Sequence, residues 1–190
     1  MNDQPGNLVI ISGPSGAGKS TIVRELIDQC PLQLVASVSA TTRQPRPGEK
    51  ASKDYHFLAQ EEFQRRREAG EFLEYKEVFG RGDWYGTLRS EVSTGLSDGK
   101  WVVLEIDVQG ALTVVDQIPT AITVFIHPGS MAELERRLRD RGTETEESLS
   151  RRLEVAAQEM QAIDRYRHEV INDDKDTAIR SLSELLQSYA

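Results

Sequence analysis

The chain of 190 residues has one cysteine, no long apolar run and fewer basic than acidic residues, and each shortage excludes a class of protein. A lone cysteine, Cys30, cannot form an internal disulfide, which argues against a disulfide-stabilised secreted scaffold and favours the cytoplasm. No apolar run reaches membrane-spanning length, and the stretch MNDQPGNLVII lacks the basic flank of a signal peptide. The net charge of −8 argues against a general nucleic-acid surface, which needs clustered Lys and Arg. We therefore expect a cytoplasmic protein without a membrane or nucleic-acid partner, and the oligomeric state stays open.

Short apolar runs alternate with helical patterns along the chain, which predicts an α/β protein with parallel strands. Most of the runs lack strict polar alternation, as is typical of strands buried on both faces. The predicted strands are NLVIIS, LQLVASVS, WVVLEID, ITVFIH and HEVIN, and the predicted helices cover 19–29, 60–69, 88–97, 109–117, 131–140, 144–167 and 175–189. The segment 41–85 mixes Pro, Gly and charge with short runs such as YHFLA and FLEYKEV, so it predicts a small separate lobe.

The strongest local signal is IISGPSGAGKST, residues 10–21, which contains G-x-x-x-x-G-K-S between a predicted strand and a predicted helix. Glycines let backbone N–H groups turn inward around a phosphate, and the following helix adds the positive end of its dipole. Lys19 can reach the outer phosphates and the Ser20 hydroxyl can bind Mg²⁺. The residues that we expect to contact ATP are Gly13, Pro14, Ser15, Gly16, Ala17, Gly18, Lys19, Ser20 and Thr21. The alternative for the motif is an incidental Gly-rich turn, and the alternative for Thr21 alone is an ordinary helix residue.

Two acids at the end of a predicted strand are candidates for the other half of this site. WVVLEIDVQG places Glu105 and Asp107 two residues apart, on one face of the strand. Asp107 lies at the carboxyl end, where ligands gather in open α/β sheets, so we expect it to hold metal-bound water or a substrate base. The alternative is that Asp107 only caps the end of the strand.

A basic loop in SVSATTRQPRPGEKASKDYHF is a candidate second phosphate site. It carries Arg43 and Arg46 among prolines, followed by Lys50, Lys53 and Tyr55. Prolines stiffen such a loop, and guanidinium groups bind phosphate oxygens with two parallel hydrogen bonds. The alternative is a solvated basic loop. The phosphate-loop motif alone leaves a kinase, a GTPase and a motor open.

Arginines in the C-terminal third of the chain predict a helical lid over the phosphate site. Arg137 and Arg141 are four residues apart on one helix face, and GTETEESL interrupts that helix before the next one, which carries Arg152. The alternative is that these arginines pair with Glu133 and neighbouring acids on a solvated surface.

Seven segments in order resemble guanylate kinases, a family of nucleoside-monophosphate kinases: SVSATTRQPRPGE, DYHF, GEFLEY, WYGT, LEIDVQGA, RRLRDRGTETEESLSRRL and VINDD. The resemblance runs from Leu8 to the C-terminal helix. It implies an α/β P-loop fold of three layers with a central parallel sheet, a small mixed GMP-binding lobe and a helical lid. The implied ATP-binding core covers 1–40, 88–130 and 168–190, the GMP-binding lobe covers 41–87, and the lid and its connecting helix cover 131–167.

The resemblance also implies roles in transfer of the γ-phosphoryl group from ATP to GMP with Mg²⁺. It places the GMP phosphate against Arg43, Arg46, Tyr55 and Tyr85. It places the guanine among Ser39, Glu74, Thr87 and Asp107, with Glu105 close by. Catalysis would fall to Lys19, Arg43, Arg137, Arg141 and Arg152, the adenine would lie near Asn172, and the metal near Ser20 and Asp107.

The sequence departs from the family pattern at two places, and two other functions are alternatives to guanylate kinase activity. The turn FGRGDWYGT is longer than usual, which affects the placement of Tyr85, and Glu105 stands where Asp is usual. Guanylate kinase-like modules that bind proteins without catalysis are one rival, but they typically have an eroded phosphate loop, whereas Lys19 and Ser20 are intact here. A P-loop kinase acting on a sugar phosphate is the other, and it would not need Glu74.

Overall fold

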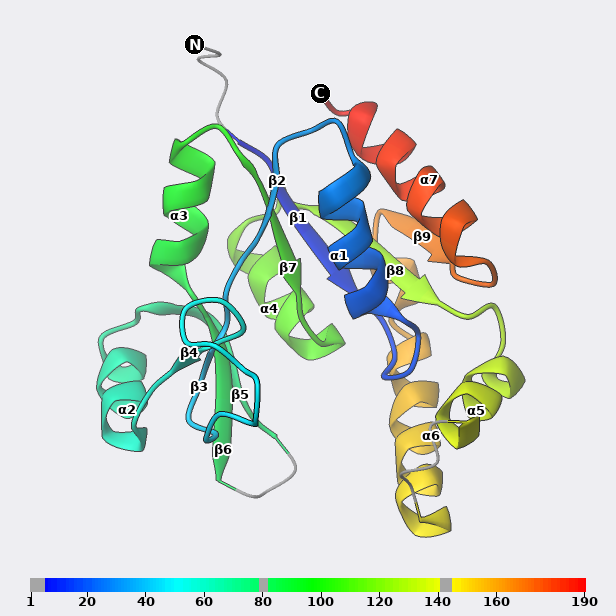
Figure 1. The fold of residues 1–190 in the computed structure, drawn as a ribbon, viewed down its shortest axis with the longest axis horizontal. Coiled ribbons are helices and arrows are strands. Elements are labelled where there is room, and N and C mark those ends of the chain that lie inside the picture. Colours follow the sequence, from blue (N-terminus) through cyan, green and yellow to red (C-terminus); the bar gives the residue numbers. More distant parts are fainter. Residues whose placement is uncertain (1–5, 79–81, 141–144) are drawn as a thin grey trace.

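A computed structural model describes residues 6–78, 82–140 and 145–190, and within them a five-stranded parallel sheet forms the centre. The strand order is β2-β7-β1-β8-β9, with all neighbours parallel (Figure 1). The strands are β1 (Leu8–Ser12), β2 (Leu34–Ala36), β7 (Trp101–Glu105), β8 (Ile122–His127) and β9 (His168–Ile171). The predicted α/β fold with a central parallel sheet is confirmed.

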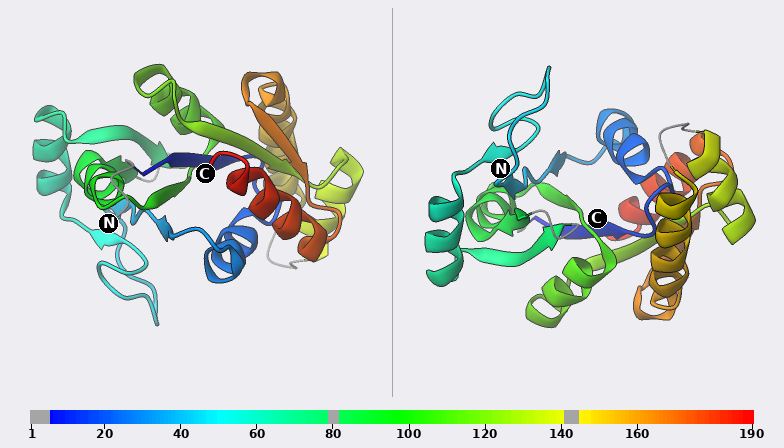
Figure 2. Two further views of the ribbon diagram at one scale, coloured as in Figure 1. Left: turned by 90° about the horizontal axis from the view of Figure 1, so that it is seen from above. Right: turned by 90° about the horizontal axis from the view of Figure 1, so that it is seen from below.

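Apolar side chains of the central strands point alternately into two cores, one on each face of the sheet. Val9 and Ile11 pack with α1 (Lys19–Gln29) and α7 (Lys175–Gln187). Leu8 and Ile10 pack instead with α3 (Arg89–Ser97) and α4 (Val108–Gln117). Figure 2 shows α1 and α7 on one side of the sheet and α4 on the other. Burial on both faces explains why these strands are apolar without alternation.

A second, mixed sheet of four strands lies beside the first, in the order β4-β3-β6-β5 (Figure 1). Its strands are β3 (Ala40–Thr41), β4 (His56–Phe57), β5 (Phe72–Val78) and β6 (Asp83–Leu88), and α2 (Gln60–Glu68) packs on it. Phe63 of α2 stacks on Phe72 with ring centroids 4.5 Å apart, and Ala40 and Leu88 complete this separate core. The sheet spans the segment in which the sequence predicts a small lobe.

Two helices project from the carboxyl edge of the central sheet and share a core of their own. They are α5 (Met131–Asp140) and α6 (Glu146–Met160), joined through Leu134, Leu138, Leu149 and Ala156. Thr145 caps α6 by accepting the Ser148 backbone N–H at 3.2 Å. None of the helices in the described ranges is long and apolar enough to cross a membrane.

The prediction of one helix over 144–167 is wrong, because α6 ends at Met160 and a 3₁₀ turn follows at Ile163–Arg165. Contacts with the central sheet redirect the chain there. The Arg167 backbone N–H donates to Oγ1 of Thr123 at 2.9 Å, and its guanidinium donates to the Pro119 carbonyl at 2.6 Å. These bonds align the chain with β8, so the segment continues as β9.

The predicted strand over 32–39 is also too long, because β2 covers only Leu34–Ala36. The Ser37 N–H still donates to the Val103 carbonyl of the central sheet at 2.9 Å. Two residues later, the Ser39 carbonyl accepts the His56 N–H of the second sheet, also at 2.9 Å. The apolar run is therefore divided between two sheets.

Candidate active site

The loop 13–18 connects β1 to α1 at the carboxyl edge of the central sheet, between the ends of β7 and β8. The connection that follows β1 leads to β2, which lies on one side of β1 in the sheet. The connection that follows β7 leads to β8, which lies on the other side of β1. Ligands bind at such switch points in open α/β sheets. Gly13 has φ 138° and a Cβ there would lie 2.0 Å from the Ile126 carbonyl oxygen, so only glycine lets the loop turn this close to β8.

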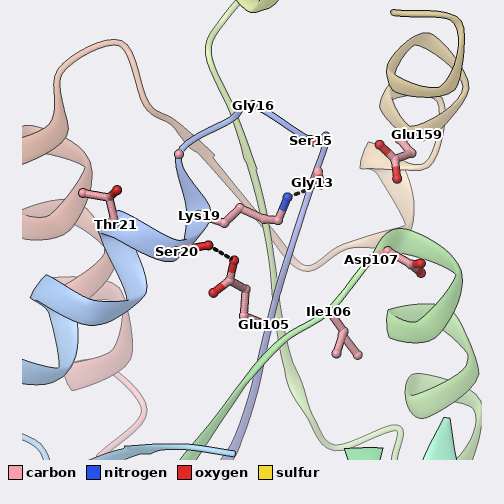
Figure 3. Close-up of a pocket in the computed structure, with 11 residues that line it drawn as sticks. Gly13, Ser15, Gly16, Lys19, Ser20, Thr21, Glu105, Ile106, Asp107 and Glu159 are labelled. Carbon is pink, nitrogen blue, oxygen red and sulfur yellow. Dashed lines mark hydrogen bonds between the residues drawn. The ribbon is translucent and has the colours of Figure 1, made fainter. Parts of the chain in front are cut away.

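The loop borders a cavity of about 340 Å³ that is open to solvent (Figure 3). Its lining combines loop residues with the two strand-end acids and one acid of α6: Gly13, Ser15, Gly16, Gly18, Lys19, Ser20, Thr21, Glu105, Ile106, Asp107 and Glu159. The volume falls in the range of small-molecule sites. Pro14 and Ala17 belong to the same loop, and Ala17 is fully buried.

Lys19 lies at the start of α1 with its amine folded back over the loop. Its Nζ donates to the carbonyl oxygen of Gly13 at 2.6 Å (Figure 3) and to that of Pro14 at 3.0 Å. Since an ammonium group has three rotatable donors, it can exchange these carbonyls for phosphate oxygens without a change of backbone. The structure therefore places a cation at the mouth of the phosphate loop.

The two acids after β7 have different partners. The Ser20 hydroxyl donates to Oε1 of Glu105 at 2.5 Å, so Glu105 is the acid beside the loop hydroxyl (Figure 3). Asp107 instead accepts the Gly110 backbone N–H at 2.8 Å as the N-cap of α4, and pairs with Lys76 of β5 at 3.0 Å. The sequence predicted Asp107 as the acid that holds the metal with Ser20 and placed Glu105 near the guanine, whereas here Glu105 is the acid bonded to Ser20 and Asp107 lines the same cavity. The Lys76 pair joins the second sheet to the cavity.

The second sheet carries a cluster around the predicted GMP phosphate position. Arg43 donates from Nε to the Tyr85 hydroxyl at 2.9 Å, and Tyr55 meets the Tyr85 ring edge-on at 5.8 Å between centroids. Burial is the main cause that raises the pKa of Tyr55, which keeps its phenol protonated as a donor. Arg46 is exposed on the loop nearby, so three of these four predicted phosphate contacts adjoin one another and the fourth lies three residues along the loop.

Glu74 and Thr87 face each other across β5 and β6, at the predicted guanine position. The Thr87 hydroxyl donates to Oε1 of Glu74 at 2.6 Å. Burial raises the pKa of Glu74, and the Thr87 hydrogen bond opposes that rise. An ideal Cβ on Gly110 would lie 2.9 Å from the other carboxylate oxygen, so the absence of a side chain there makes room for Glu74. Ser39 is half-buried at the entry to β3.

Neither Arg137 nor Arg152, two of the three predicted lid arginines, is among the described residues that line the cavity. Arg137 of α5 donates to Glu133 and to the backbone carbonyl of Asn172, both at 2.7 Å. Hydrogen bonds from Arg136 and Arg137 lower the pKa of Glu133 to about 2. For Arg137, the structure has the ion pair with Glu133 that the alternative interpretation predicted. Arg152 lies half-buried on α6. Arg141 lies outside the described residues.

Asn172 braces the phosphate loop from the end of β9. Its Nδ2 donates to the Ala17 carbonyl at 2.7 Å in a buried position, and a Cβ on Gly18 would lie 2.5 Å from that nitrogen. Gly18 also has φ 88°, which glycine adopts without strain. The side chain predicted to lie near the adenine is thus engaged with the loop, and its backbone carbonyl binds Arg137 of α5.

Two acids of the site were missed by the sequence analysis. Glu159 of α6 lines the cavity, and burial is the main cause that raises its pKa, while Lys19 opposes the rise (Figure 3). It lies seven residues after Arg152, which places both on one helix face, and that spacing was available in the sequence. Glu49 binds Arg43, at 2.8 Å.

Comparisons with known proteins agree on one family. The family model described as guanylate kinase matches residues 5–189. The guanylate kinase of Rhodopirellula baltica is 59% identical over 96% of this chain and 88% of that protein, and that of Clostridium perfringens is 45% identical over 97% and 84%. The crystal structure of guanylate kinase from Anaplasma phagocytophilum has a TM-score of 0.77 at 32% identity, covering 98% of this chain and 87% of that one. A shikimate kinase from Bacteroides thetaiotaomicron, at 16% identity and a TM-score of 0.53, shares the fold alone.

Proposed function

The chain belongs to the guanylate kinase family, and from this premise we propose that it transfers the γ-phosphoryl group of ATP to GMP, giving ADP and GDP. The observation that carries the proposal is that a phosphate loop and a candidate base-binding carboxylate, Glu74, lie on neighbouring elements of one structure. A complete phosphate loop borders the cavity, and on β5 the half-buried Glu74 accepts from Thr87 and lies against Gly110 of α4, three residues after the cavity residue Asp107. The Lys76–Asp107 ion pair at 3.0 Å links β5 of the second sheet to Asp107, which lines that cavity.

The proposed chemistry needs no covalent protein intermediate. Phosphoryl transfer depends mainly on positioning and on stabilisation of charge, and the phosphate of GMP is itself the nucleophile. Loop amides and Lys19 would hold the donor phosphates, and the Arg43 cluster would hold the acceptor. Arg137, Arg141 and Arg152 would offset charge on the transferring group when α5 and α6 close over it. Closure would also exclude water, which otherwise competes with GMP for the phosphoryl group.

The oxygen donors beside the loop fit a magnesium ion. Mg²⁺ prefers oxygen ligands and is usually held by one or two protein groups together with phosphates and water. The Ser20 hydroxyl and Glu105 carboxylate are 2.5 Å apart at the cavity, and Asp107 lines the same cavity, so these residues would hold the ion. When bound, the ion would neutralise charge on the β- and γ-phosphates.

Base choice would depend on Glu74. Guanine presents N1–H and N2–H as adjacent donors, which complement a carboxylate, whereas adenine presents an acceptor at N1. Because the Thr87 hydroxyl proton is already donated to Glu74, Thr87 fixes the carboxylate. Ser39 is then the hydroxyl that would donate to guanine O6.

The rival functions are less well supported. A non-catalytic scaffold would not need the intact Lys19 and Ser20, and many relatives that cover most of this chain are named guanylate kinase. A sugar-phosphate kinase would not need Glu74 to accept hydrogen bonds from a guanine base. We also propose a cytoplasmic location, because the single cysteine, Cys30, can form no internal disulfide.

The test is a comparison of acceptors in steady state. ADP formation should be measured with GMP, AMP and a sugar phosphate at saturating ATP, and kcat/KM should be largest for GMP. A higher kcat/KM for AMP or for the sugar phosphate would replace the proposed acceptor, and no turnover with any of them would favour the scaffold.

A further inference from the structure

Most hydrogen-bond donors of Arg43 are occupied by the protein itself. Its Nε donates to the Tyr85 hydroxyl at 2.9 Å, and Nη1 donates to the Gln44 carbonyl at 2.7 Å. Glu49 takes one N–H from each terminal nitrogen, at 3.0 Å from Nη1 and 2.8 Å from Nη2. A guanidinium group has five N–H donors, so among the described residues a single N–H, on Nη2, has no partner. Arg43 therefore cannot present a two-pronged fork to a phosphate while Glu49 stays in place.

The Arg43–Glu49 pair is sheltered, unlike most surface ion pairs. The side chain of Arg43 is 13% exposed and that of Glu49 is 20% exposed. The guanidinium carbon lies 5.5 Å from the centre of the Tyr55 ring and 5.9 Å from that of Phe57. The hydrogen bonds from Arg43 are the main cause that lowers the pKa of Glu49, so the pair stays ionised at neutral pH.

Glu49 also holds the backbone that carries Arg46. Its Oε2 accepts the Arg46 backbone N–H at 2.7 Å, and the Glu49 N–H returns a bond to the Arg46 carbonyl at 3.1 Å. These bonds close a turn through Pro47 and Gly48, and Gly48 has φ 91°, which suits glycine. One carboxylate therefore fixes the side chain of Arg43 and the main chain of Arg46.

Building on the proposed function, we infer that Glu49 is a positioning residue for the acceptor phosphate. By holding Arg43, it keeps the Nε–H bond to Tyr85 in place. Because the phenol oxygen accepts that bond, the phenol proton is directed elsewhere and can donate to the ligand. Arg43 adds charge and one N–H, and the exposed guanidinium of Arg46 supplies the two parallel bonds to phosphate oxygens.

The test replaces Glu49 with Gln, which keeps the size but removes the charge. An amide accepts only through its oxygen, so either the Nη2 bond is lost, or the Nη1 bond and the Arg46 backbone bond are lost together. We expect KM for GMP to rise by about 10- to 100-fold, the range for one hydrogen bond to a charged group, with little change in kcat or in KM for ATP. Glu49→Asp keeps the carboxylate and should recover part of the loss.

Two further variants separate positioning from a general loss of structure. Glu62→Gln removes a similar carboxylate, which pairs with Arg65 and Arg66 on α2, the helix that packs on the same sheet. This control should leave KM for GMP unchanged. In an Arg43→Gln background, Glu49→Gln should add much less to KM than it does alone, because the carboxylate then has no guanidinium to hold.

The opposite results overturn the inference. An unchanged KM for GMP in Glu49→Gln would mean that the carboxylate does not position the phosphate contacts. A lower KM would mean that its charge only repels the phosphate. An equal rise of both KM values with a fall in Tm would mean general unfolding, and full additivity with Arg43→Gln would mean independent action. Calorimetric titration with GMP distinguishes a failure of the proposed function. If the wild-type chain binds no GMP, the function and this inference fall together, whereas equal binding by wild type and Glu49→Gln removes the inference alone.

Discussion

The helix residue Gly110 offers a test of the acceptor site, because a methyl group added there would meet the carboxylate of Glu74. An ideal Cβ at this position would lie 2.9 Å from the Oε2 atom of Glu74 and 3.3 Å from its carboxyl carbon. Ordinary contacts begin at 3.4 Å, so in Gly110→Ala the carboxylate must retreat by at least about 0.5 Å. The end of a flexible side chain yields more easily than the helix backbone, so Glu74 moves and α4 stays.

Gly110→Ala is expected to lower kcat/KM for GMP and to leave the stability of the fold unchanged. Alanine is favoured over glycine in helices by up to about 1 kcal/mol, so Tm should not fall in Gly110→Ala. A two-bond contact to a base contributes roughly 1–3 kcal/mol, so displacing Glu74 should lower kcat/KM for GMP by about 5- to 150-fold. KM for ATP should be unchanged, because Gly110 does not line the cavity at the phosphate loop.

The assay measures kcat/KM for GMP and AMP, KM for ATP and Tm in Gly110→Ala and in a control. Thr113→Ala is the matched control, since it raises helix propensity at an exposed position of the same helix. The account predicts a lower GMP/AMP ratio in Gly110→Ala alone. An unchanged ratio together with an unchanged Tm would refute the assignment of Glu74 to the base. A fall in activity toward both nucleotides, with a lower Tm, would show instead that α4 has moved.

Three other predictions concern the donor loop and Glu74. Lys19→Met should largely abolish turnover without changing Tm, because the cation for the outer phosphates is lost, and near-wild-type rates would refute the loop assignment. Only ionised Glu74 can accept from both guanine donors without turning an O–H toward one of them. Burial raises the pKa of Glu74, so KM for GMP should rise as pH falls through that raised pKa. This step should be absent in Glu74→Gln, and a flat wild-type profile down to the ordinary glutamate value of about 4.3 would contradict it. Asn172→Asp turns the donor to the Ala17 carbonyl into an oxygen, so KM for ATP should rise by about 5- to 150-fold, the effect of an unmet buried group. The control Asp173→Asn changes an exposed neighbour, and equal KM values in the two variants would argue against bracing of the loop by Asn172.

Local patterns predicted the elements whose signals are local. Helix α1 begins at Lys19 because the glycine loop ends there, and α5 covers the predicted 131–140 because its apolar residues recur at helical spacing. The central parallel sheet followed from strands apolar on both faces. The phosphate loop was predictable because its glycines and its lysine are adjacent in sequence and their geometry is set by the backbone.

Features set by distant contacts were not predictable from the same patterns. The end of α6 depends on bonds from Arg167 to residues before and within β8, and no glycine or proline marks it. The engagement of Glu105 with Ser20 depends on how β7 lies beside β1, which spacing along the chain does not determine. The Glu49 clamp on Arg43 depends on the fold of an irregular loop.

The most direct test of the central claim follows the phosphoryl group itself. Phosphorus NMR of the chain with ATP, Mg²⁺ and GMP should show the γ-phosphate of ATP appearing as the β-phosphate of GDP, with ADP and GDP formed in equal amounts. The account predicts no inorganic phosphate beyond that in a sample lacking GMP. Release of inorganic phosphate in place of GDP would show a hydrolase, and unchanged ATP in the presence of GMP would contradict a guanylate kinase activity altogether.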